Sequence, residues 1–130
     1  MTTAQNSTLT VRTETIVECR LVRISGRIDH TNSDNFLEEL SVHAAEVSEG
    51  GGMVVDLGEV EYITSAGLRA LLLAQRTLTA AGARLVVTRI SGVVKEVFRI
   101  SKFDSLLSVS ETIKAAVSQI SPSAAEAFTD

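Results

Sequence analysis

Residues 54–68 read VVDLGEVEYITSAGL, and this pattern predicts a strand that leads into a helix. A short apolar run reaches an acidic turn that begins at Asp56, and a second extended piece ends at Ile63. Ser65 is predicted to be the N-cap of a helix over 65–81, where apolar residues recur at three- and four-residue spacing. The Ser65 hydroxyl would then lie beside unpaired N–H groups at a partly positive helix end, where a phosphate could bind.

The segments around this stretch alternate between strands and helices. Residues 53–57, the helix after Ser65 and residues 83–88 form a strand–helix–strand unit, which predicts two parallel strands with a right-handed crossover. Thr31 or Asn32 is the predicted N-cap of a helix over 33–47, which Gly50–Gly52 stops. The other predicted elements are strands 9–15 and 16–25 as a hairpin, helix 92–100, strand 106–109 and helix 111–120.

Length and composition predict one globular domain. The chain has 130 residues, 45% of them hydrophobic, and its longest strictly apolar run, 70–74, is far too short to span a bilayer. The net charge of −4 argues against nucleic acid as a partner, because such proteins usually carry a basic face. The polar segment 1–7 shows no secretory signal, and the single Cys19 fits a reduced compartment, so we expect a cytoplasmic protein.

The residues offer little catalytic chemistry. With two histidines and one cysteine, no spacing indicates a metal site. A set of Ser65, His30 and Asp56 can be assembled on paper, but no nucleophile-elbow motif accompanies it. Gly50–Gly52 lacks the lysine and hydroxyl of a phosphate-binding loop. We therefore expect no catalytic residue, no metal and no cofactor.

The residues around Ser65 carry a resemblance to a known family. Val55-Asp56-Leu57, Val60, Tyr62-Ile63 and Thr64-Ser65-Ala66-Gly67-Leu68 resemble the signature of the STAS family, in particular its anti-sigma factor antagonists. The loop at 26–29 is similar to that family's loop after an early strand. The resemblance implies an α/β fold, a single STAS domain whose four- to five-stranded mixed sheet is flanked by helices. Outside the resemblance, the polar start of the chain predicts a flexible N-terminal arm at 1–8, and the break at Ser121-Pro122-Ser123 predicts a disordered tail at 121–130, which leaves the domain at 9–120.

The resemblance also implies a non-enzymatic function in partner switching. Such antagonists bind an anti-sigma factor that is also a serine kinase, which inactivates them by phosphorylating the serine at the helix start; a serine/threonine phosphatase reverses this. The matching position is Ser65, and Thr64 and Ala66 stand where family members often have an acidic and a second hydroxyl residue. Ser65 is thus the one clear phosphoacceptor, and Thr64 stays open as a second one. The implied partner-binding residues are Asp29, Thr64, Ser65, Ala66, Gly67, Leu68 and Arg69.

Elementary electrostatics agrees with such a switch. A phosphate on Ser65 adds about −1.5 to −2 charges at a helix N-terminus, where free N–H groups near Gly67 can donate hydrogen bonds to it without refolding of the domain. Ala66 and Gly67 would let a partner backbone approach the hydroxyl, and Arg69 and Arg76 form a stripe that could face an acidic partner.

Several structural alternatives remain open at this point. Ser65 could be only a helix cap, and Asp56 more readily stabilises a turn through local hydrogen bonds than contacts a partner. Asp29 could act near Ser65 or cap the following helix, and Arg69 could be merely solvated. In place of the switch, the domain could bind a small ligand or lipid, or serve as a scaffold.

Overall fold

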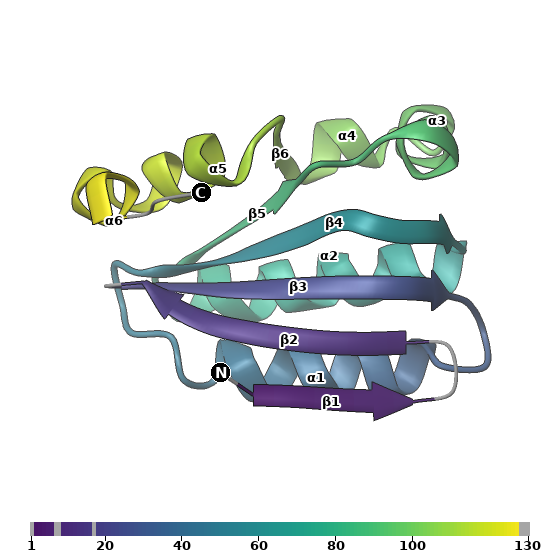
Figure 1. The fold of residues 1–130 in the computed structure, drawn as a ribbon, viewed down its shortest axis with the longest axis horizontal. Coiled ribbons are helices and arrows are strands. Elements are labelled where there is room, and N and C mark those ends of the chain that lie inside the picture. Colours follow the sequence, from purple (N-terminus) through teal and green to yellow (C-terminus); the bar gives the residue numbers. More distant parts are fainter. Residues whose placement is uncertain (1, 7–8, 17, 128–130) are drawn as a thin grey trace.

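A computed structural model describes residues 2–6, 9–16 and 18–127. Figure 1 shows a mixed sheet with helices on both faces, which confirms the expected α/β architecture. The six strands lie in the order β1-β2-β3-β4-β5-β6. The first three pair antiparallel, and β3 to β6 pair parallel. They span Thr2–Asn6 (β1), Leu9–Ile16 (β2), Cys19–Ile28 (β3), Gly52–Ile63 (β4), Arg84–Thr88 (β5) and Ser108–Ser110 (β6).

The helices cover the sheet unequally. Side chains from α1, α2 and α3 join the main core on one face, and α5 and α6 cover part of the opposite face with a smaller cluster. In Figure 1 the strands β1 to β4 face the viewer, with α1 and α2 behind them. The helices span Ser33–Ala44 (α1), Ser65–Ala80 (α2), Gly92–Ile100 (α3), Phe103–Leu106 (α4), Ile113–Ile120 (α5) and Pro122–Ala127 (α6).

Both terminal segments contain secondary structure that the sequence did not predict. The segment expected to be a flexible arm contains β1, which extends the hairpin of β2 and β3 and brings the strand count to six. The segment expected to be a disordered tail contains α6, because Pro122 suits the first turn of a helix and the Ser121 hydroxyl accepts the Ala124 N–H at 3.3 Å. Ala124 is fully buried. Residues 1, 7–8 and 128–130 of these two predictions lie outside the described residues.

The acidic turn expected at Asp56 is a bulge within one continuous strand. Arg23 pairs with Asp56 but Ser25 pairs with Glu59, so β4 carries an extra residue at this point. The Asp56 carboxylate accepts the Gly58 N–H at 2.9 Å, which is the local role that we favoured. Asp56 is buried, and the guanidinium of Arg89 lies 3.5 Å from its oxygen.

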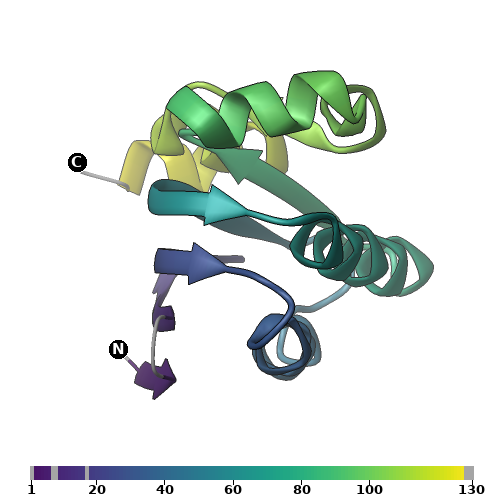
Figure 2. The same cartoon turned by 90° about the vertical axis from the view of Figure 1, so that its right-hand side faces the viewer.

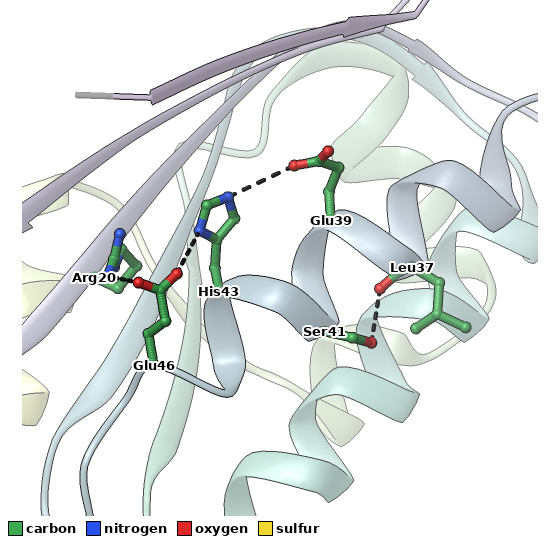
Figure 3. A network of polar contacts seen from close by, with 6 residues as sticks. All are labelled: Arg20, Leu37, Glu39, Ser41, His43 and Glu46. Carbon is green, nitrogen blue, oxygen red and sulfur yellow. Dashed lines mark hydrogen bonds and ion pairs between the residues drawn. The ribbon is translucent and has the colours of Figure 1, made fainter.

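A polar network fastens the C-terminal part of α1 to the sheet (Figure 3). Arg20 on β3 forms an ion pair with Glu46 at 3.1 Å, just after the helix. The ring of His43, which is buried, lies between Glu46 at 3.7 Å and Glu39 at 3.6 Å. These contacts hold α1 in place, and α1 ends at Ala44 rather than at the expected Val47.

Candidate functional site

The candidate site lies where β3 and β4 end and the chain turns into α1 and α2. Ile28 and Ile63 are register partners at the ends of these parallel strands, so the residues that follow them, Asp29 and Thr64, start neighbouring loops. Figure 2 looks at this end of the molecule, with α1 and α2 side by side on one face of the sheet. The site is therefore built from a short loop and a helix N-terminus, both held by the core.

Thr64, rather than Ser65, is the N-cap of α2, which corrects our prediction. Its backbone is extended, with φ −94° and ψ 172°, because its N–H continues the strand pairing by donating to the Ile28 carbonyl at 2.9 Å. Its hydroxyl, half-buried, also donates to the Ile28 carbonyl, at 3.4 Å. The first bond of the helix then runs from the Leu68 N–H to the Thr64 carbonyl at 3.0 Å.

Ser65 is the first residue within α2, and its side chain is exposed. The N–H groups of Ser65, Ala66 and Gly67 precede the first helical hydrogen bond, so they are the donors that a helix start leaves without a helical partner. No acidic residue occupies the first turn of α2. An exposed hydroxyl thus stands at the positive end of a 16-residue helix, a location that favours an anion.

Gly67 and Leu68 face inward rather than toward a partner. A Cβ on Gly67 would lie 2.6 Å from Ile28 Cγ2 and 2.8 Å from Ile63 Cγ1, so only glycine lets α2 pack this closely on the strand ends. Leu68 is 1% exposed and belongs to the main core. These two predicted site residues hold the start of α2, and with it Ser65, against the core. The small size of Gly67 allows the close contact with Ile28 and Ile63.

Asp29 organises its own loop and does not cap α1. Its Oδ1 accepts the Thr31 N–H at 2.9 Å and also the Thr31 hydroxyl. Both bonds lower the pKa of Asp29 below its ordinary value, and the bond from the Thr31 hydroxyl has the larger effect. Asn32 is the N-cap of α1, which settles the choice between Thr31 and Asn32, and its amide donates to the Arg27 carbonyl at 2.8 Å. Asp29 therefore holds the loop between β3 and α1, and this loop follows the strand that pairs with the one leading into α2.

The outer surface of α2 carries the remaining predicted residues. Arg69 and Arg76 are exposed, and Ala66 is half-buried. Ala66 and Arg69 also line a groove of about 130 Å³ between α1 and α2, which the sequence analysis did not predict. The groove depends on the distance between two helices, and no pattern within either helix indicates that distance.

The structure does not assemble the catalytic set considered from the sequence. Asp56 lies seven residues before the end of β4, which places it roughly 20 Å from Ser65 at the rise of a strand. His30 is exposed in the loop before α1. Across the described ranges, no group of three histidine, cysteine or acidic side chains is arranged to hold a metal ion. Within the same residues, every helix is too short or too polar to cross a membrane.

Comparisons with known proteins identify the family of this chain. The family model of the STAS domain matches residues 10–116. The protein named "Putative anti-sigma factor antagonist BtrV" of Bordetella bronchiseptica is 38% identical over 94 residues, which cover 72% of this chain and 78% of that protein.

Two solved structures share the fold. An anti-sigma factor antagonist from Mycobacterium paratuberculosis is 20% identical, with a TM-score of 0.77 over 86% of this chain and 93% of its own. The anti-sigma factor antagonist SpoIIAA in its unphosphorylated form is 17% identical, with a TM-score of 0.69 over 92% of this chain and 99% of its own.

Proposed function

Because this chain belongs to the STAS domain family, we propose that it is an anti-sigma factor antagonist that phosphorylation of Ser65 switches off. Its partners are an anti-sigma factor with serine kinase activity and a serine/threonine phosphatase that removes the phosphate. The chain acts by binding rather than by catalysis, and it works in the cytoplasm with these partners. The relationship to BtrV supports the antagonist role.

The observation that carries the switch is the exposed hydroxyl of Ser65 at the N-terminus of α2. A kinase can reach this hydroxyl without unfolding the helix. The neighbouring Thr64 hydroxyl is half-buried and donates to the Ile28 carbonyl, so it is the poorer acceptor. Phosphorylation is therefore proposed at Ser65 alone.

The phosphate changes the surface more than the fold. The phosphate adds about −1.5 to −2 charges at a helix end whose first N–H groups favour an anion. No side chain of the core needs to move, because Ser65 points to solvent while Gly67 and Leu68 make the internal contacts. A partner that packs against Ser65 has to accommodate this charge, and each 1.4 kcal/mol of repulsion or desolvation weakens binding about tenfold.

The proposed partner surface consists of the exposed or half-buried members of the predicted set. These are Asp29, Thr64, Ser65, Ala66 and Arg69, while Gly67 and Leu68 contribute by holding the helix start in position. Asp29 belongs to the loop that follows β3, which pairs with the strand leading into α2. The surface thus contains an acid, a base and the phosphoacceptor within one helix start and one loop.

Phosphorylation with site mapping tests this proposal. Each anti-sigma factor with serine kinase activity encoded in the same genome is purified and incubated with the chain, ATP and Mg²⁺. We expect one phosphate on the wild type and on Thr64→Val, and none on Ser65→Ala. A phosphate that remains on Ser65→Ala, or a wild type that no kinase modifies, would contradict the proposal.

Binding of a small ligand is a second candidate function. A pocket of about 230 Å³ lies between α3, α4 and the end of β6, lined by Ile90, Lys95, Arg99, Asp104, Val109, Ser110 and Glu111. Its lining combines apolar side chains with charges of both signs, which fits a small molecule that carries both polar and apolar groups. Thermal stabilisation of the chain by such a molecule, together with the absence of phosphorylation, would favour this function instead.

A further inference from the structure

The groove between α1 and α2 starts immediately beside the proposed phosphoacceptor. Ala66 and Ala70 lie one helical turn apart on α2, and their short side chains leave a space of about 130 Å³ against Leu37 of α1. Engineered cavities of roughly 150 Å³ bind a molecule as large as benzene. The groove therefore has room for one aliphatic side chain.

One apolar residue of the groove has no evident role in the fold. Leu73 lines the groove and is half-buried. Among the described residues, it does not belong to the half-buried apolar side chains that pack on the main core. The neighbouring Leu72 does pack on that core. Within the described residues, Leu73 therefore keeps part of its apolar surface open to the groove.

Opposite charges stand on the two walls of the groove. Asp34 lies on α1 and Arg69 on α2, and both side chains are exposed. Within the part of the chain that the structure describes, neither of them makes an ion pair. An occupant of complementary charge would place a cation beside Asp34 and a carboxylate beside Arg69, which defines its orientation across the two helices.

We propose that this groove seats an aliphatic side chain of the anti-sigma factor, flanked by a basic group next to Asp34 and an acidic group next to Arg69. The inference rests on the proposed function and adds a second contact to it. The groove supplies an apolar anchor, while Ser65, one residue before Ala66, supplies the charge that controls binding. A buried apolar side chain surrounded by polar contacts is the usual arrangement of a strong interface contact.

A charge exchange tests the orientation. The double variant Asp34→Arg with Arg69→Asp keeps the net charge of the chain and exchanges the charges on the two walls of the groove. The matched control, Glu126→Arg with Lys114→Asp, makes the same exchange at exposed positions on α6 and α5, across the sheet. Affinity for the anti-sigma factor kinase that phosphorylates the wild type is measured by calorimetry, with a thermal melt of each variant.

We expect the groove exchange to weaken binding at least about tenfold and the control to change it less than about twofold. Leu73→Ala, which removes only apolar contact, is expected to weaken binding about three- to tenfold and keeps the test valid if the exchange variant does not fold. A wild type that binds while Leu73→Ala and a folded exchange variant bind equally well would overturn the groove proposal alone. A wild type that binds no anti-sigma factor would overturn the proposed function and the groove with it.

Discussion

Replacing Gly67 by alanine tests how the start of α2 is held. The added Cβ would lie 2.6 Å from Ile28 Cγ2 and 2.8 Å from Ile63 Cγ1. Both atoms belong to β-branched side chains at the ends of paired strands, which have little freedom to rotate away. Overpacking of this kind costs about 1–3 kcal/mol, and the better helix propensity of alanine returns up to about 1 kcal/mol. Because both contacts are shorter than 3.0 Å, the cost falls in the upper part of this range, about 2–3 kcal/mol, and we expect a net loss of about 1–2 kcal/mol.

Equilibrium unfolding in urea measures this loss, and a thermal melt should show a midpoint lower by about 3–10 °C for a domain of this size. Ser65→Ala is the matched control, because it changes an exposed side chain in the same helical turn. Its stability should stay within about 0.5 kcal/mol of the wild type. If Gly67→Ala were as stable as the wild type, the close packing of α2 on Ile28 and Ile63 would not be the reason for glycine at this position.

Three further predictions concern single side chains. Arg89→Ala should lower the free energy of unfolding in urea by about 1–3 kcal/mol, because the buried Asp56 carboxylate loses the guanidinium 3.5 Å away. Unchanged stability would show that the ion pair of Arg89 with Asp56 does not stabilise the fold. Burial, with a smaller contribution from Glu18, raises the pKa of Cys19 to about 11, so this thiol should react with iodoacetamide at pH 8 only after unfolding. In an NMR titration the lowered pKa of Asp29 should rise toward the ordinary value in Thr31→Val. An unshifted titration of Asp29 in Thr31→Val would exclude the Thr31 hydroxyl as the cause of the lowered pKa. Because the folded-state pKa is depressed, the Asp29 carboxylate stabilises the native loop above about pH 4, and this stabilisation is lost as the pH falls further.

The strand–helix–strand unit around Ser65 could be predicted because its signals are local. Apolar runs and helical spacing both lie within the elements they define. The prediction of α3 over 92–100 agrees with the structure for the same reason. The position of the N-cap was wrong by one residue, since Thr64 owes its extended backbone to a bond with Ile28, which lies far away in sequence.

The features that could not be predicted depend on contacts between distant segments. The role of Gly67 is set by two isoleucines on neighbouring strands, and the sequence alone indicated only its small size. The groove between α1 and α2 results from how two helices pack. The strand β1 forms by pairing with β2, although its own residues are mostly polar and show no strand periodicity.

The most direct test of the central claim compares the affinity of the two forms of this chain for the anti-sigma factor. The chain is phosphorylated to completion and purified, and its dissociation constant is measured by calorimetry beside that of the unmodified chain. Treatment with a serine/threonine phosphatase provides the control, because it should restore the original affinity. We predict that the phosphate on Ser65 weakens binding by at least about tenfold, or 1.4 kcal/mol. Equal affinity of the two forms would show that Ser65 does not control the interaction.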